Sequence, residues 1–248
     1  MNLNKIGMCI AKSGKRKIYV ASPEDNEELD LKTFDKIKLK EGKFQFMPNG
    51  DNTRQVISVF GASGSGKSYW ISEFIKEYHM TYKKNHIYLL SECSEDEAFD
   101  DKSYIKRILI NQELLDDKIE WDEFKDCCVV LDDVDALSKD YKKYIDELRN
   151  KLLKNARKNN VSVVISNHNL CDGALTKTIL HESQIIVFFM NNGFNRGIKY
   201  FLESYVGLNK TAIENLRKLT TRATVYIKSY PQIIMTDKYI TTINDLSK

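Results

Sequence analysis

From residue 55 onward, apolar residues gather in short, nearly continuous runs separated by longer stretches of helical spacing. A strand that is buried on both faces has no polar side, so such runs indicate parallel strands inside a sheet. They lie at Gln55–Phe60, His86–Ser91, Cys127–Leu131, Val161–Ile165 and Gln184–Phe189, with a shorter apolar piece at Arg107–Ile110. Strands that alternate with helices predict an α/β fold, a mostly parallel sheet flanked by helices.

Helical spacing is clearest in two segments, Ser68–Tyr82 and residues 141–158. The second segment places apolar side chains on one face and lysines on the other. These lysines are Lys142, Lys143, Lys151, Lys154 and Lys158. Such a face can meet phosphates, but more often it is simply solvated.

The remaining segments are less regular. We predict short helices at Lys199–Tyr205 and Thr211–Leu219, then strands at Thr224–Ile227 and Ile233–Met235. The acidic stretch Glu92–Asp101 is interpreted as a solvated loop.

Residues 1–54 lack helical periodicity and contain two hairpin-like pieces. One pairs Ile6–Ile10 with Lys17–Ala21, and the other pairs Lys36–Lys40 with Lys43–Met47. We therefore expect a small β-rich N-terminal subdomain over 1–54, followed by one domain over 55–248 that includes the C-terminal helices and strand pair.

Composition narrows the class of protein without naming a function. The chain has 248 residues, of which 42% are hydrophobic and 29% charged, as in globular proteins. Its net charge of +3 is too small to indicate nucleic-acid binding by itself. We find no apolar run long enough to span a membrane and no signal core, so we expect a soluble intracellular protein. The five cysteines include no C-x-x-C pair, which argues against zinc and a disulfide framework, and Cys127 and Cys128 are expected to be buried thiols.

The strongest chemical signal follows the first predicted strand. Residues 61–68 fit the phosphate-binding motif G-x-x-x-x-G-K-[ST], between a strand and a helix as the motif requires. Backbone amides would bind phosphates, Lys67 would bridge the β- and γ-phosphates of ATP, and Ser68 would hold Mg²⁺. The candidates for nucleotide binding are Gly61, Ala62, Ser63, Gly64, Ser65, Gly66, Lys67, Ser68 and the adjacent Tyr69.

Two acids end the third apolar run, as in a Walker B motif. Ligands of α/β proteins gather at the carboxyl ends of parallel strands, so Asp132 and Asp133 are expected beside the phosphate loop. We assign Asp132 to Mg²⁺ and Asp133 to the attacking water, as its general base. Asp135 is interpreted as a helix cap or a solvated acid.

Polar residues after the fourth run are candidates for sensing the γ-phosphate. These are Asn167 and His168, although such residues also cap turns. Phosphoryl transfer often uses an arginine from the same or a neighbouring subunit. Arg157 is the first choice for this role, with Arg149 and Arg222 as alternatives.

Several of these segments, taken together, resemble one family. They are Gly61–Ser68, Val129–Asp133, Arg157 with Val161–His168, Tyr205–Leu208, Thr221–Ala223 and Tyr230-Pro231. In this order they are similar to the genome-packaging ATPases of large nucleocytoplasmic DNA viruses, a branch of the FtsK-HerA motors. The resemblance covers about residues 54 to 240. Two positions depart from the family pattern, Lys158 after the arginine and Ala223 where an aromatic residue is common.

The resemblance implies a RecA-like P-loop NTPase core with a small β-rich N-terminal extension, and ATP hydrolysis with Mg²⁺. It also implies a homo-oligomeric ring around double-stranded DNA that pumps the DNA into a preformed capsid, with a capsid or portal protein as partner. The location implied is the virus factory in the host cytoplasm, and the virion. By the same resemblance Asp132 is the metal acid, Asp133 the base, and Asn167 with His168 the sensor.

Three other functions remain open for a P-loop protein of this size. A nucleoside or nucleotide kinase is disfavoured, because the chain has no arginine-rich lid segment and its paired acids lie on a strand separated from the loop strand by His86–Ser91. Another P-loop ATPase of DNA replication or repair is a further alternative. A binder that does not hydrolyse nucleotide would not need Asp133 as a second acid.

Overall fold

The computed structural model describes residues 7–21, 40–51, 53–191, 195–219, 221–229 and 231–246. The chain forms two compact units. The first, which we call the continuous unit, is Thr53–Ile186, and the second, the split unit, combines Met1–Asn52 with Val187–Lys248. The N-terminal residues thus group with the last part of the chain.

A parallel sheet forms the centre of the continuous unit. Its order is β10-β5-β9-β8-β6-β7, and every pair from β5 to β7 is parallel. The strands are β5 (Val56–Phe60), β6 (His86–Ser91), β7 (Ile105–Leu109), β8 (Cys127–Leu131), β9 (Val161–Asn167) and β10 (Ile185–Phe188). Every residue of β5, β8 and β9 is buried. The predicted α/β fold with a mostly parallel sheet is therefore confirmed.

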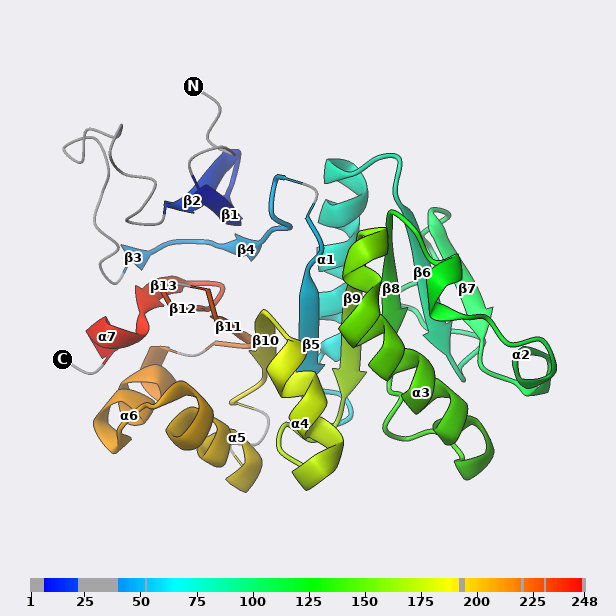
Figure 1. Ribbon diagram of the computed structural model, residues 1–248. Coiled ribbons are helices and arrows are strands. Elements are labelled where there is room, and N and C mark those ends of the chain that lie inside the picture. Colours follow the sequence, from blue (N-terminus) through cyan, green and yellow to red (C-terminus); the bar gives the residue numbers. More distant parts are fainter. Residues whose placement is uncertain are drawn as a thin grey trace. The chain divides into compact units, whose positions relative to one another are not determined.

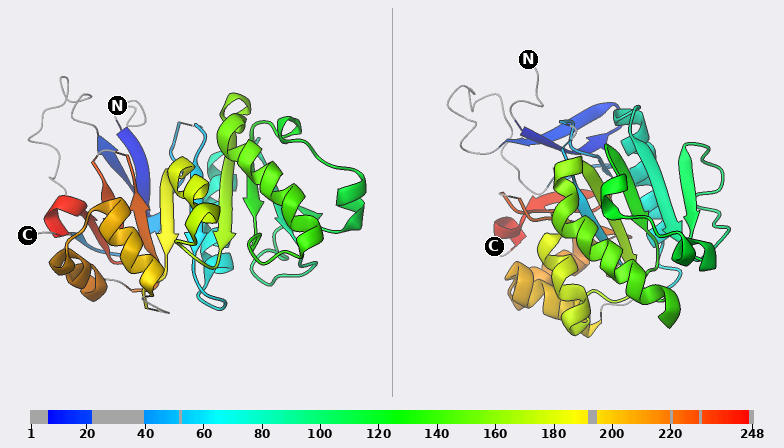
Figure 2. Two further views of the ribbon diagram at one scale, coloured as in Figure 1. Left: turned by 60° about the horizontal axis from the view of Figure 1, so that its bottom comes forward. Right: turned by 45° about the vertical axis from the view of Figure 1, so that its right-hand side comes forward.

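Helices cover both faces of this sheet (Figures 1 and 2). The helix α1 (Lys67–Thr81) lies on one face, and α3 (Lys139–Asn155) and α4 (Gly173–Glu182) lie on the other. Each turns apolar residues inward, such as Ile71 and Ile75 of α1 and Leu152 of α3, which are almost wholly buried. A short helix, α2 (Gln112–Asp116), and α4 were not predicted from the sequence.

The position of β9 determines which residues meet at the edge of the sheet. It lies between β5 and β8, with Phe60 beside Asn167 and Leu131 beside Ile165. The carboxyl ends of these three strands therefore come together. One expectation needs correction: His86–Ser91 separates the acid-bearing strand from the loop strand along the chain, but β9 separates them in the sheet.

The acidic stretch is more ordered than a solvated loop. Phe99 within it is 1% exposed. Arg107 of β7 donates to the carbonyl oxygen of Cys93 at 2.7 Å and also pairs with Asp100. One buried aromatic ring and one arginine thus tie this stretch to the edge of the sheet.

In the split unit, β1 (Gly7–Ser13) and β2 (Arg16–Ala21) form an antiparallel hairpin, as predicted. The second predicted hairpin is wrong. The strand β3 (Lys40–Glu41) pairs with β13 (Tyr239–Thr242), whereas β4 (Gln45–Phe46) pairs with β1. The rest of its first arm, residues 36–39, lies outside the described residues.

The C-terminal part of the split unit contains helices and an antiparallel meander. The helices are α5 (Arg196–Phe201), which continues as a π-helical turn at Leu202–Val206, α6 (Lys210–Leu219) and α7 (Ile243–Leu246). The strands β11 (Thr224–Ile227) and β12 (Ile233–Met235) pair with one another, and β12 pairs with β13. Phe201 packs edge-on against Phe188 and Tyr226 and so joins α5 to this core.

Two expectations from composition can be checked over the described parts of the chain. The five cysteines are free thiols, and Cys127 and Cys128 are fully buried, as expected. Among the described helices, none combines the length and the apolar composition needed to cross a bilayer.

Candidate nucleotide-binding and hydrolysis site

The phosphate loop connects β5 to α1 at the carboxyl edge of the parallel sheet. Gly64 and Gly66 have φ values of 71° and 102°, which L side chains rarely adopt, so the motif needs glycine at both positions. Gly66 is also the N-cap of α1, and no side chain caps that helix end. The first amides of α1 are therefore available to an anion.

Lys67 connects this loop to the Walker B acids. Its side chain is 5% exposed, and Nζ donates a hydrogen bond of 3.0 Å to the carbonyl oxygen of Gly61. The same nitrogen lies 3.3 Å from Oδ1 of Asp133. The ammonium group thus lies where the loop and the end of β8 meet, which suits a group that contacts phosphate.

Asp133 follows β8 in an unusual backbone conformation. Its φ of 45° lies in the left-handed region, which turns the chain sharply out of the strand. Oδ1 accepts a hydrogen bond of 2.8 Å from the hydroxyl of Ser166. Because Ser166 belongs to β9, the neighbouring strand holds this carboxylate beside Lys67.

Asp132 has the properties of a carboxylate that binds a cation. Its side chain is buried, and Oδ1 has no hydrogen-bond partner among the residues that the structure describes. Burial, and secondarily the charge of Asp133, raises the pKa of Asp132 to about 6. A buried oxygen without a partner is costly, and a divalent cation would satisfy it. Asp132 and the partly buried hydroxyl of Ser68 therefore fit Mg²⁺.

His168 lies directly after β9, between two carboxylates. Its Nε2 is 3.7 Å from Oδ2 of Asp133, and its Nδ1 is 3.1 Å from Oδ1 of Asp135. The backbone amide of His168 also donates to Oδ2 of Asp135 at 2.8 Å. Ligand atoms of these three side chains lie within 4.8 Å of one another. The structure thus brings Lys67, Asp133 and His168 together.

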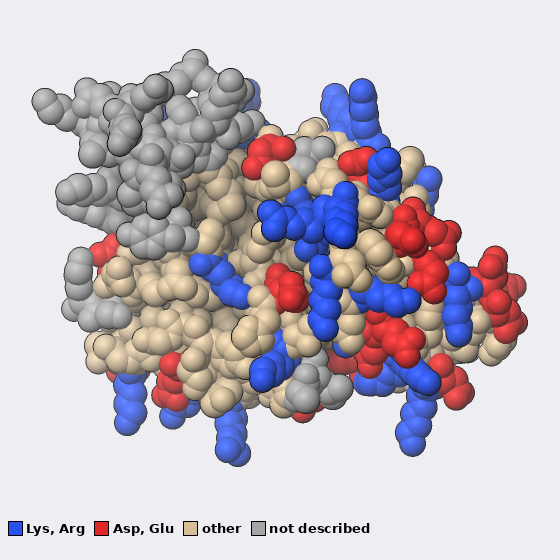
Figure 3. All heavy atoms as spheres, viewed as in Figure 1, with Lys and Arg blue, Asp and Glu red and all other residues tan. Residues whose placement is uncertain are grey.

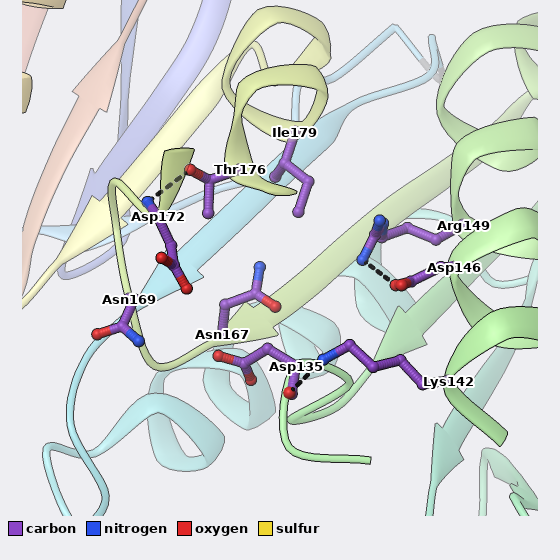
Figure 4. Close-up of a pocket in the computed structure, with 9 residues that line it drawn as sticks. All are labelled: Asp135, Lys142, Asp146, Arg149, Asn167, Asn169, Asp172, Thr176 and Ile179. Carbon is purple, nitrogen blue, oxygen red and sulfur yellow. Dashed lines mark hydrogen bonds and ion pairs between the residues drawn. The ribbon is translucent and has the colours of Figure 1, made fainter. Parts of the chain in front are cut away.

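Asn167 points away from this group. Its side chain is 2% exposed and lines a cavity of about 30 Å³ beneath α3 and α4, together with Arg149 and Thr176 (Figure 4). Neither polar atom of its amide has a hydrogen-bond partner among the described residues. A cavity of this size holds about one water molecule. Of the two predicted sensor residues, His168 faces Asp133, and Asn167 faces the helices.

The arginine candidates occupy three different places. Arg157 is exposed in the 3₁₀ turn Ala156–Asn159, which precedes β9 and therefore lies at the amino end of the sheet. Arg149 is buried in α3 and pairs with Asp146 at 2.6 Å. Arg222 belongs to the split unit and is exposed. Within one subunit, the structure does not bring Arg157 to the phosphate loop.

Other candidates from the sequence are also placed. Tyr69, in the first turn of α1, is 58% exposed. The lysine face of α3 is not a uniform basic surface, because Lys151 pairs with Glu120 at 2.8 Å and Lys142 donates to the carbonyl oxygen of Asp135. Figure 3 shows basic and acidic side chains interspersed over α2 and α3, on the face of the molecule that carries these helices.

Sequence reasoning missed two residues of this site. Ser166 orients Asp133, and its alternation with Asn167 along β9 could have indicated that it faces the acids. Asp135 was assigned to a cap or to solvent, but it holds His168 with both oxygens. Nothing in the local sequence indicates that pairing, because His168 is 33 residues away.

Comparisons with known proteins bear on the family and the fold of the chain. No family model matches the chain. The uncharacterized protein V3 of Sputnik virophage is 34% identical over 238 residues, which cover 94% of this chain and 95% of that protein.

Solved structures show the same fold. B204, the DNA-packaging ATPase from Sulfolobus turreted icosahedral virus, matches with a TM-score of 0.52 and 15% identity, over 77% of this chain and 98% of B204. The genome packaging NTPase B204 from Sulfolobus turreted icosahedral virus 2, in complex with ATP-gammaS, matches with a TM-score of 0.50 and 13% identity, over 76% of this chain and 97% of that chain.

The identity to the virophage protein, over nearly the whole of both chains, shows that the two proteins belong to one family. The resemblance to viral packaging ATPases that the motifs predict is also confirmed. The chain belongs to the same family as protein V3 of Sputnik virophage, and it shares its fold with the viral DNA-packaging ATPase B204.

Proposed function

We propose that this protein is an ATP-hydrolysing motor that translocates double-stranded DNA and packages it into a preformed viral capsid. The observation that carries the proposal is the placement of Lys67 Nζ 3.3 Å from Asp133 Oδ1, with β9 between their two strands. This arrangement puts a phosphate-binding cation beside a carboxylate that can act on water. The fold is shared with B204, a DNA-packaging ATPase whose relative from the second Sulfolobus virus was solved in complex with ATP-gammaS, and this likeness supports the choice of ATP and of DNA.

Each step of hydrolysis has a residue in the continuous unit. The amides of residues 61–66 and the ammonium of Lys67 hold the phosphates, and Asp132 with Ser68 would hold Mg²⁺. When bound there, the cation would supply positive charge that offsets the negative charge of the phosphates. Asp133 accepts a proton from water as the water oxygen attacks the γ-phosphorus, and the bond to the β-phosphate oxygen breaks to release ADP.

The site also supports a coupling route to movement. His168 lies 3.7 Å from Asp133, the residue proposed to act on the attacking water. The adjacent Asn167 lies beneath α3 and α4. A shift of His168 on loss of the γ-phosphate would therefore move the adjacent Asn167, and Asn167 would in turn move α3 and α4. We propose that the DNA acted on lies within a homo-oligomeric ring, with a capsid or portal protein as partner, at virus factories in the host cytoplasm.

Arg157 fits this proposal only as a residue that acts between subunits. It lies at the end of the sheet opposite to its own phosphate loop. Mixing Arg157→Ala subunits with Lys67→Ala subunits should restore part of the ATPase activity, since each variant supplies what the other lacks. Absence of rescue at every mixing ratio would exclude Arg157 from this role.

The decisive experiment is ATP hydrolysis by the full chain with and without duplex DNA. We expect duplex DNA to stimulate hydrolysis, and the stimulation to fall steeply with salt because phosphate contacts release counterions. Phosphate transfer from ATP to nucleosides, without a response to DNA, would instead establish a kinase and overturn the proposal.

A matched lysine pair controls the assay. Lys67→Ala should lower both the basal and the DNA-stimulated rate by about 10³-fold. Lys76 is exposed on the same helix, so Lys76→Ala should leave both rates unchanged.

A further inference from the structure

Asp135 and His168 make two contacts that together fix one ring orientation. One oxygen of the carboxylate accepts the backbone amide of His168 at 2.8 Å, and the other lies 3.1 Å from Nδ1. The backbone of Asp135 is fixed as well, because its carbonyl oxygen accepts a hydrogen bond of 2.8 Å from Lys142 of α3 (Figure 4). The imidazole is therefore held from one side by an anchored carboxylate.

The contact at Nδ1 decides which ring nitrogen carries the proton. An ionised carboxylate can only accept hydrogen bonds, so Nδ1 must be the donor. In a neutral imidazole the other nitrogen is then an acceptor. Nε2 lies 3.7 Å from Oδ2 of Asp133.

Two acceptors at this distance cannot bond directly, because 3.7 Å is longer than a hydrogen bond. One water molecule that lies beside both atoms, within hydrogen-bond distance of each, can donate one proton to each. Such a water would be oriented by Asp133 on one side and His168 on the other.

We propose that Asp135 is a positioning residue for hydrolysis, which holds His168 in the Nδ1–H tautomer so that Nε2 and Asp133 together orient the attacking water. The inference rests on the proposed function, in which Asp133 accepts a proton from that water. His168 then keeps the second proton of the water in a hydrogen bond during attack, and Asp135 contacts neither the water nor the nucleotide. The tautomer follows from the geometry of the pair and is measurable without any turnover.

The first test is the tautomer in the wild-type chain. The chain has four histidines, so ¹⁵N shifts of the imidazole nitrogens can be assigned by comparison with a His168→Gln variant. A protonated Nδ1 and a bare Nε2 at neutral pH are expected for His168. A dominant Nε2–H tautomer, or an imidazolium, would overturn the proposal.

The second test exchanges donor and acceptor in the contact of residue 135 with Nδ1 of His168, and keeps its contact with the backbone amide of His168. In Asp135→Asn, the amide oxygen can still accept the backbone amide of His168, while its NH₂ group faces Nδ1. The ring should then switch to the Nε2–H form. We expect kcat to fall about 10- to 100-fold with KM for ATP unchanged, the scale found when a residue that orients a functional ligand is replaced. An unchanged tautomer or an unchanged kcat contradicts the inference.

Controls separate this role from a structural one and from failure of the proposed function. Asp140→Asn changes an exposed carboxylate in the first turn of α3 and should leave both readouts unchanged. A general loss of fold would lower the melting temperature, which we expect to be similar in both variants and the wild type. If the wild-type chain does not hydrolyse ATP, the proposed function fails, whereas hydrolysis that is insensitive to Asp135→Asn removes only the positioning role.

Discussion

The two ends of the parallel sheet in the continuous unit use the same kinds of polar residue for different purposes. At the carboxyl end, Lys67 and His168 each lie within 4 Å of a carboxylate oxygen of Asp133. At the amino end, the guanidinium of Arg54 donates to the carbonyl oxygens of Leu152, Leu153 and Val161 at 2.7 to 3.0 Å. At the carboxyl end these polar side chains contact each other, whereas at the amino end Arg54 binds backbone carbonyl oxygens.

The two ends also differ in whether their buried polar atoms have hydrogen-bond partners. Asp132 and Asn167, at the carboxyl end, have buried polar atoms that lack partners among the described residues. Arg54, at the amino end, donates to carbonyl oxygens at the C-terminus of α3, where the helix carries partial negative charge. Buried polar atoms without a partner cost stability, so each calls for a ligand, an ion or a water molecule. If this difference is real, substitutions at the carboxyl end should lower ATP hydrolysis, and substitutions at the amino end should lower the free energy of unfolding.

The largest effect is expected for Lys67→Ala. Its ammonium is the cation that the described structure places between the phosphate loop and Asp133. Removing it should lower ATPase turnover by about 10³-fold, the upper range for the loss of one preorganised group that stabilises developing charge. Turnover and nucleotide binding should be measured together with thermal unfolding. A fall in activity explained by a lower melting temperature would break the contrast between the two ends.

A smaller effect is expected for Asp133→Asn. The amide cannot accept the proton of the attacking water, so turnover should fall by about 100-fold while ATP binding is retained. The substitution is nearly isosteric, and its oxygen can still accept the Ser166 hydroxyl. Single-turnover hydrolysis and equilibrium nucleotide binding distinguish these outcomes. Unchanged turnover would transfer the role of base to another acid, such as Asp135 or Glu92.

The carboxyl end could largely be predicted from the sequence, because its features are local. The phosphate motif needs only eight consecutive residues between a strand and a helix, and Asp132 and Asp133 directly follow an apolar strand. The parallel sheet was predicted for a similar reason, since strands buried on both faces are apolar throughout.

Features that depend on partners distant in sequence were not predicted. The strand β3 pairs with β13 near the other end of the chain, although a local hairpin across Glu41-Gly42 fits the sequence equally well. Arg54 binds carbonyls 98 to 107 residues away, and Asp135 binds His168 33 residues away. Polar residues of this kind occur throughout the surface of any globular protein, so their roles become visible only when the fold brings the partners together.

The smallest effect, and one confined to stability, is expected for Arg54→Met. Methionine keeps much of the aliphatic stem but removes the three hydrogen bonds that Arg54 donates, although the carbonyl oxygen of Leu152 keeps its bond from the backbone amide of Ala156. Loss of hydrogen bonds from a charged group at a helix C-terminus should lower the free energy of unfolding by about 2 kcal/mol. Urea denaturation measures this change, and turnover per folded molecule should stay at the wild-type value.

Arg157→Met is the matched control at the same end of the sheet. Arg157 is exposed, so its replacement should change the free energy of unfolding by no more than about 0.5 kcal/mol. Equal destabilisation by the two substitutions would mean that positive charge near the end of α3, and not the hydrogen bonds of Arg54, stabilises this end. Loss of turnover in folded Arg54→Met would be more serious, because it would show that the amino end also takes part in the chemistry.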